Sequence, residues 1–467
     1  MLFNSLQFAV FFALLLVIHR ALPERLRNRL LLGASLVFYS LWLPAYLLLL
    51  LGDIAVNYAL LRGMVRSARP RRYLVASIVF TLGLLGVFKY AGLAVEAAIP
   101  ILHGGFGIDL AVPDFFLPLG ISFYSFQIIA LSVDVYRGNI APVPGPSRYL
   151  LFVSFFPQLI AGPILRGRQL LPQLERGGRP TPERTQRAVW LLTSGMVKKV
   201  IFADFLLGTF VDQAFGAPGS GSAPYHLIAV YSFAFQIYFD FSGYTDIARG
   251  LALLLGFELP QNFTEPYLAR NPAEFWRRWH ITLSQWLRDY LYIPLGGNRA
   301  GAARVSINLM ITMLLGGLWH GAGWTFVAWG GLHGLLLVAH RLFGRSARED
   351  APLRLRDAWK ILLCFHAVCL LWVFFRAPSF EQALVFLEAL FTLGHFEQWP
   401  VLQTLVIAIC VALHAMERWL RLHRSQLIVR LEGARWGSAA EGAIVGVVAA
   451  LAFALARSGG EFIYFQF

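Results

Sequence analysis

His320 combines a reactive side chain with an unusual setting. It lies near the middle of residues 305–340, a stretch that contains no Asp, Glu, Lys or Arg. Ionisable residues inside membrane segments are rare and usually functional. A neutral imidazole can be buried at modest cost and still accept a proton, so His320 has the chemistry of a general base. A hydrogen-bonded core histidine is the structural alternative.

The residues around His320 strengthen the functional interpretation. The segment GGLWHGAGW places glycines on both sides of it, which leave room for a substrate or another backbone: Gly316, Gly317, Gly321 and Gly323. Two further histidines, His333 and His340, share the stretch, so position alone does not select His320. The glycine-rich context favours His320, and we interpret the other two as structural.

A second group of reactive side chains lies in residues 275–299, FWRRWHITLSQWLRDYLYIPLGGNR. On a helix with 100° per residue, one apolar face collects Phe275, Trp279, Leu283, Trp286 and Tyr290. The opposite side collects four polar residues within an arc of about 80°: Arg277, His280, Ser284 and Arg288. The pattern therefore predicts an amphipathic helix with a polar stripe.

An interfacial membrane anchor would also contain tryptophan and arginine. Such an anchor does not need a histidine aligned with two arginines and a serine, so the stripe favours a polar site. Arg277 and Arg288 could bind a phosphate or a carboxylate group.

The composition indicates which kind of scaffold positions these residues. The chain is 57% hydrophobic and 14% charged, whereas soluble proteins contain roughly 25% charged residues. We therefore predict an all-α polytopic membrane protein. The net charge of +14 comes from basic residues in short loops between apolar runs. That distribution follows the positive-inside rule and argues against nucleic-acid binding.

The basic loops give an expected threading. Residues 1–19 are interpreted as the first span rather than a cleaved signal, with both termini outside and the basic loops at 20–29 and 62–72 in the cytoplasm. Residues 215–226 form an expected outside turn. Further spans are expected at 30–43, 44–62, 73–91, 115–136, 189–210, 225–255, 358–376, 400–420 and 441–457, with a short one near 383–393.

Two segments do not fit a simple crossing. Residues 150–165 contain two prolines and favour a re-entrant or half-buried segment. Residues 305–340 exceed the roughly 20 residues of one span and have arginines at both ends, which favours a hairpin; a single long tilted helix is the alternative. We expect eleven or twelve membrane segments in one domain, 1–467.

The remaining candidates for chemistry are interpreted as structural. We expect Asp240 and Asp246 to pair with the arginine-rich stripe, and we treat Asp53 and Lys89 in the same way. No disulfide framework or metal-ligand spacing is present, and the cysteines are expected to be small core residues: Cys364, Cys369 and Cys410.

The stretch 275–299 followed by GLWHGAGWTFVAWGGLHG resembles the membrane-bound O-acyltransferases. Weaker similarities accompany it in FPQLIAGPILR (156–166), FDFSGYTDIARG (239–250), LPLGISFYSFQ (117–127) and the tail FIYFQF. The resemblance covers nearly the whole chain. Within the family, YIPLGGNR is most similar to the branch that O-acetylates bacterial alginate.

The resemblance implies a central tunnel through a bacterial inner membrane. An acyl thioester such as acetyl-coenzyme A would enter from the cytoplasm, with no bound cofactor or metal. An exported polysaccharide, or a periplasmic SGNH-type acetyltransferase, would wait on the other side. The family's catalytic histidine falls on His320. Its second polar position, often asparagine in eukaryotic members, falls on His280.

The residues and the resemblance together suggest roles. His320 would remove the proton from the incoming hydroxyl, and His280 would orient or polarise the thioester carbonyl. The donor phosphates would bind Arg277, Arg278 and Arg288, with Ser284 beside them. If the acetyl group is first attached to His320, the two histidines exchange roles.

Three other functions remain open at this stage. A transporter or flippase would move a polysaccharide or lipid precursor without chemistry, although the repeated broken helices typical of transporters are missing. A scaffold would hold a soluble acetyltransferase. A D-alanyl-type transferase would act on a cell-wall polymer.

Overall fold

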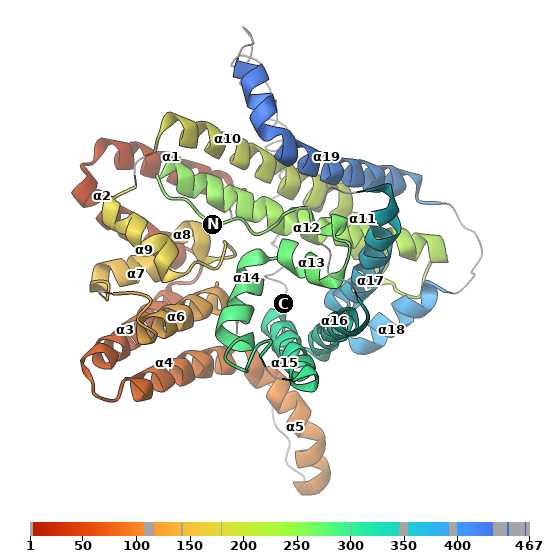
Figure 1. The fold of residues 1–467 in the computed structure, drawn as a ribbon, viewed down its shortest axis with the longest axis horizontal. Helices are drawn as coiled ribbons and strands as arrows, with labels where there is room; N and C mark the ends of the chain where they lie inside the picture. Colours follow the sequence, from red (N-terminus) through yellow and green to blue (C-terminus); the bar gives the residue numbers. More distant parts are fainter. Residues whose placement is uncertain are drawn as a thin grey trace. The chain divides into compact units, whose positions relative to one another are not determined.

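The computed structural model describes residues 3–106, 116–141, 143–178, 180–299, 301–344, 354–391, 399–432, 446–447 and 463. Every regular element in these ranges is a helix (Figure 1), which confirms the predicted all-α class. The chain forms two compact units: Met1–Leu191 with Ile247–Pro260, and Leu192–Asp246 with Gln261–Phe467. The expectation of one domain over 1–467 stays a prediction.

Six of the described helices are long and apolar enough to cross a membrane: Pro44–Arg66, Pro70–Ile99, Ala302–His320, Trp324–Phe343, Leu355–Arg376 and Val401–His423. Two shorter apolar helices are Leu6–Ala21 and Ile121–Tyr136. The chain is therefore a multi-pass membrane protein. The expected total of eleven or twelve segments stays a prediction, and the span expected at 441–457 lies almost entirely outside the described residues.

Prolines set the helix boundaries of the first unit. Pro44, Pro70 and Pro146 each occupy the first turn of a helix, where the missing N–H has no partner to lose. The helices are α1 (Leu6–Ala21), α2 (Glu24–Ser40), α3 (Pro44–Arg66), α4 (Pro70–Leu85), α5 (Ala91–Phe106), α6 (Ile121–Tyr136), α7 (Pro146–Ser154), α8 (Phe156–Leu159) and α9 (Gly167–Arg176). The expected break near Pro44 is confirmed.

The segment 150–165 folds into α7, the short α8 and a following turn, and residues 151–165 are buried. Neither helix is long enough to cross a bilayer, as predicted from the two prolines. Nearby, Asp53 is part of a buried polar network between α3, α4 and α6. Asn57 Nδ2 donates to Asp53 Oδ1 at 2.7 Å and to Thr81 Oγ1 at 3.1 Å, and Ser77 links Asn57 to Ser132 of α6. These contacts fit the structural interpretation of Asp53, which stays a prediction.

The second unit holds both histidines of interest. Its helices after α10 (Pro182–Met196) are the π-helix η2 (Val197–Gly208), α11 (Thr209–Gly216), α12 (Ala223–Leu254), α13 (Pro272–Arg278), α14 (Ile281–Leu287), the π-helix η4 (Arg288–Tyr292), α15 (Ala302–His320), α16 (Trp324–Phe343), α17 (Ala358–Arg376), α18 (Phe380–Ala389) and α19 (Val401–Glu432). The helices α10 and α12 contribute residues to both units.

Residues 305–340 form a hairpin, as predicted, because α15 ends at His320 and α16 begins at Trp324. Glycines allow the two helices to approach closely. A Cβ atom on Gly317 would lie 2.3 Å from the Phe326 carbonyl oxygen, and one on Gly330 would lie 2.4 Å from the Met313 carbonyl oxygen. The space beside Gly317 is therefore occupied by another backbone, which was one of the two expected alternatives.

Two adjacent lysines of η2 neutralise the acidic residues of α12. Lys199 lies 2.5 Å from Asp240 and Lys198 lies 3.1 Å from Asp246. The expected structural pairing of the aspartates is confirmed, but the expected partners were wrong. The lysines lie within ion-pair distance because η2 packs along α12: a Cβ on Gly243 would lie 2.9 Å from the Lys199 amide nitrogen.

The three cysteines, Cys364, Cys369 and Cys410, are buried and free. They behave as small core residues, as expected from the apolar runs that contain them.

Candidate active site

The segment around His280 is not one continuous helix, so the predicted polar stripe is wrong. The helix α13 ends at Arg278, Trp279 is extended, and His280 adopts a left-handed conformation with φ 42° and ψ 55°. A new helix, α14, begins at Ile281. Only a few per cent of non-glycine residues have positive φ, and such strain often marks a functional site.

A preceding loop explains the break by hydrogen bonding to the backbone on both sides of it. The Thr264 N–H donates to the Arg278 carbonyl at 3.0 Å, and the Ile281 N–H donates to the Asn262 carbonyl at 2.9 Å. The Asn262 side-chain oxygen also accepts from the Thr282 hydroxyl at 2.7 Å. These bonds replace helical ones that a continuous helix would have made, and they fix His280 between α13 and α14.

The His280 side chain is fully buried. Its ring meets the edge of Phe241 at a centroid distance of 4.7 Å, and Trp319 lies 6.1 Å away. Neither ring nitrogen has a hydrogen-bond partner among the described residues. Burial lowers the pKa of His280 to about 3. The imidazole is therefore neutral at physiological pH and keeps one N–H donor and one acceptor nitrogen.

His320 is the last residue of α15 and is 4% exposed. Aromatic rings surround it, with centroids 5.0 Å away at Trp319, 5.1 Å at Trp329 and 5.4 Å at Phe375. These rings come from both arms of the hairpin and from α17. They provide an apolar environment, in which electrostatic interactions are stronger than in water.

The structure brings His280 and His320 together, with ring centroids 6.3 Å apart. Hydrogen bonds to a ring nitrogen are roughly 2.9 Å long, so one small polar group could contact both rings. A carbonyl and an incoming hydroxyl are groups of that size. The pair can thus supply one proton acceptor and one hydrogen-bond donor to the same reacting centre.

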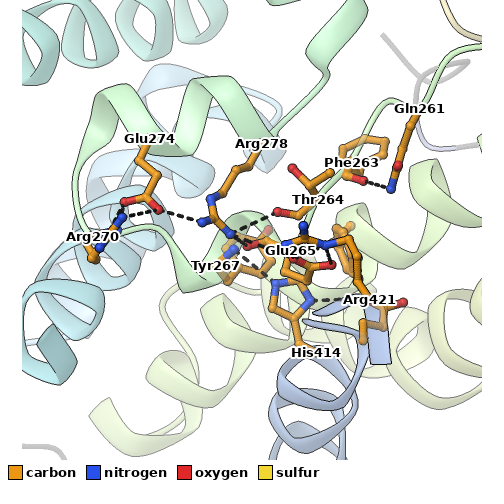
Figure 2. A network of polar contacts seen from close by, with 12 residues as sticks. Gln261, Phe263, Thr264, Glu265, Tyr267, Arg270, Glu274, Arg278, His414 and Arg421 are labelled. Atoms are coloured by element: carbon orange, nitrogen blue, oxygen red, sulfur yellow. Dashed lines mark hydrogen bonds and ion pairs between the residues drawn. The ribbon is translucent and has the colours of Figure 1, made fainter. Parts of the chain in front are cut away.

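Unlike the two histidines, the predicted donor-binding residues do not gather into one buried cluster. Arg277 and Arg288 are exposed, and Arg288 Nε lies 2.6 Å from Asp289. Ser284 donates to the Trp279 carbonyl at 3.2 Å. Arg278 is buried, and its Nη2 donates to Glu274 at 2.7 Å. Figure 2 shows Arg278 inside a network of ion pairs on α13 and its neighbours.

Several residues of the site were missed by the sequence patterns. Trp329 was predictable, because a hairpin that turns at 321–323 brings it close to His320. Asn262 and Phe375 were not predictable. One lies in a loop and the other on a separate helix, and local periodicity carries no information about contacts with distant segments. His333 accepts a hydrogen bond from Trp276 Nε1 at 3.3 Å, a contact that fits the structural role predicted for it.

The helices of membrane-spanning length define the class, a multi-pass membrane protein, and a pair of histidines is buried in its second unit. The family model of the membrane-bound O-acyltransferases matches residues 113–379. The chain belongs to this family and is an acyltransferase.

Named relatives support the same assignment. A probable alginate O-acetylase of Pseudomonas aeruginosa is 40% identical over 405 residues, which cover 85% of this chain and 76% of the relative. A peptidoglycan O-acetyltransferase of Helicobacter pylori is 39% identical over 76% of this chain and 72% of the relative. A teichoic acid D-alanyltransferase of Bacillus subtilis is 26% identical over 56% of this chain and 70% of the relative.

Proposed function

We propose that this chain transfers an acetyl group from a cytoplasmic thioester, such as acetyl-coenzyme A, for the O-acetylation of an exported polysaccharide. The observation that carries the proposal is the His280–His320 pair, buried among aromatic rings with centroids 6.3 Å apart. Two of the relatives are named for O-acetylation of alginate and of peptidoglycan. We place the chain in the bacterial inner membrane with both termini in the periplasm.

In the proposed reaction, His320 accepts the proton of the attacking hydroxyl as its oxygen bonds to the acyl carbon. The carbon–sulfur bond then breaks, and the proton passes to the departing thiolate. Neutral His280 donates its N–H to the acyl oxygen, which becomes negative in the transition state. Donors aimed at a developing charge in a dry site are usually the largest single contribution to catalysis. The acceptor hydroxyl belongs either to the polysaccharide or to a periplasmic SGNH-type acetyltransferase.

The exposed arginines Arg277 and Arg288 would hold the donor's phosphates at the cytoplasmic side, with Ser284 beside them. Arg278 is less suited to that role, because it is buried and paired with Glu274, whereas Arg288 is exposed although it pairs with Asp289. The proposed donor contact therefore rests on the two exposed arginines.

His320→Ala tests the reaction. We expect transfer of labelled acetyl from acetyl-coenzyme A to fall at least about a hundredfold, as is typical for loss of a general base. Membrane insertion and yield should match the native chain. The matched control is His340→Ala, a half-buried histidine on the same hairpin that should retain transfer. Normal acetylation by His320→Ala would refute the proposal, and a native chain that neither consumes the donor nor acquires label would indicate a scaffold.

A further inference from the structure

A cluster of charged side chains, most of them buried, lies beside the loop 261–264 that fixes His280, and its two glutamates, Glu265 and Glu274, are paired with arginines. Glu265 accepts two hydrogen bonds from Arg421, the shorter at 2.7 Å. Glu274 accepts from Arg270 at 3.0 Å and from Arg278 at 2.7 Å. Figure 2 shows these five side chains converging from the loop before α13, from α13 itself and from α19.

A fourth arginine in this cluster, Arg418, has no carboxylate within ion-pair distance among the described residues. Arg418 is 7% exposed, and its Nη1 is buried without a hydrogen-bond partner among the described residues. Its charged neighbours are Arg278, Glu265, Arg421 and Glu274. The next carboxylate along α19, that of Glu417, is engaged by Lys198 at 2.7 Å and by the Tyr238 hydroxyl at 2.8 Å.

A buried guanidinium without an acceptor is costly, because its desolvation is not compensated. Among the described residues of the cluster, four arginines face two glutamates and Asp357, which lies beside Arg270, so positive charge is in excess. Buried charges that persist in native proteins are paired or bind a ligand, and ionisable residues in or near a span usually mark a site. Arg418 lies near the end of the candidate span Val401–His423.

We propose that Arg418, beside Arg421 at the exposed side of the cluster, binds a phosphate group. Guanidinium groups match the oxygen geometry of phosphate and bind it through paired, charge-assisted hydrogen bonds. The Arg421 side chain is 43% exposed, so an anion can reach the cluster from the surface. The phosphate belongs either to a soluble molecule or to the headgroup of an anionic lipid, and both present the same chemistry to these side chains.

Phosphate-dependent thermal stability tests this site without an acyl donor, so the result is independent of the proposed transfer reaction. The full chain is placed in phosphatidylcholine nanodiscs and titrated with inorganic pyrophosphate while the midpoint of thermal unfolding is followed. A second arm replaces half of the lipid with phosphatidylglycerol. A shift with pyrophosphate identifies a soluble ligand, and a shift with phosphatidylglycerol alone identifies a lipid headgroup.

The variant Arg418→Gln should weaken pyrophosphate binding by about tenfold or more, or abolish the lipid-dependent shift. Without phosphate its unfolding midpoint should equal or exceed the native value, because an uncompensated buried charge has been removed. The matched control is Arg356→Gln, an exposed arginine that should retain the native shifts. The site is refuted if the native chain shows neither shift, if Arg418→Gln keeps them, or if Arg418→Gln lowers the midpoint without phosphate.

Discussion

The two histidines of the site were both predicted from sequence, but for different reasons. His320 was marked by its place in an uncharged stretch, and the structure confirms its burial at 4% exposed. His280 was selected from the residues by a helical stripe that does not exist, and separately by the family resemblance. Its burial and its left-handed backbone are set by the loop at 261–264, which contributes nothing to the periodicity of residues 275–290. Local sequence patterns can indicate candidate site residues, but they cannot show which distant segment packs against them.

The low pKa of His280 gives a prediction for acid stability. The folded chain protonates this imidazole only near pH 3, whereas an unfolded chain protonates it below about 6.5. The unfolded state thus binds more protons between these values, and the free energy of unfolding falls as the pH drops through this window. From pH 8 to pH 4.5 the expected loss from His280 is about 2–3 kcal/mol.

His280→Asn should remove this loss while tolerating the left-handed backbone, because asparagine is enriched there. Thermal unfolding in detergent at pH 8 and pH 4.5 measures the effect. The matched control is His103→Asn, which removes an exposed histidine of α5. If His280→Asn changes the pH dependence of the unfolding midpoint no more than this control does, the burial argument is contradicted.

At the scale of elements, the hairpin of α15 and α16 was predictable and the α13–α14 break was not. A long uncharged run with arginines at both ends indicates a hairpin by charge alone. A break that depends on hydrogen bonds from Asn262 and Thr264 is invisible to hydrophobic periodicity, because the apolar positions still repeat as in a helix. The same limit explains why the aspartates of α12 were assigned to arginines instead of Lys198 and Lys199.

The close contact inside the hairpin predicts the cost of one methyl group. In Gly317→Ala the new Cβ would lie 2.3 Å from the Phe326 carbonyl oxygen, so the helices must separate. Overpacking of this kind costs about 1–3 kcal/mol, and His320 lies one turn away. We expect a lower midpoint of thermal unfolding and reduced acetyl transfer.

The matched control is Gly83→Ala on α4, where a Cβ would have no neighbour within 4 Å. Alanine is the better helix former by about 1 kcal/mol, so this variant should be unchanged or slightly more stable. If the two alanine variants have the same midpoint, the contact between α15 and α16 does not hold the hairpin together.

At the scale of the whole molecule, composition alone predicted a helical membrane protein, and the six apolar helices agree. The orientation of the chain in the membrane was predicted from the distribution of arginine and lysine, and the fold alone does not test it. Cysteine labelling can test this orientation, because the three native cysteines are buried and thiols in apolar cores react poorly with polar reagents.

Single reporter cysteines should label from opposite sides. Ala68→Cys lies in the basic loop before α4 and should react with a membrane-impermeant maleimide in inverted vesicles. Ser220→Cys lies in the glycine-rich turn before α12 and should react in spheroplasts with an intact membrane. Both positions belong to exposed or half-exposed turns. Labelling from the reverse sides would invert the proposed topology and place the donor face on the periplasmic side.

The π-helix η2 has a consequence for how this chain can change by insertion and deletion. A π-helix bonds each residue to the one five positions along the chain, whereas an α-helix spans four. Lys199 and Asp204 are five residues apart in this segment and lie 2.9 Å from each other. If one residue between them were deleted and the segment returned to α geometry, they would be four apart and again on one face. A relative with a one-residue gap between these two positions should therefore keep both the lysine and the acid.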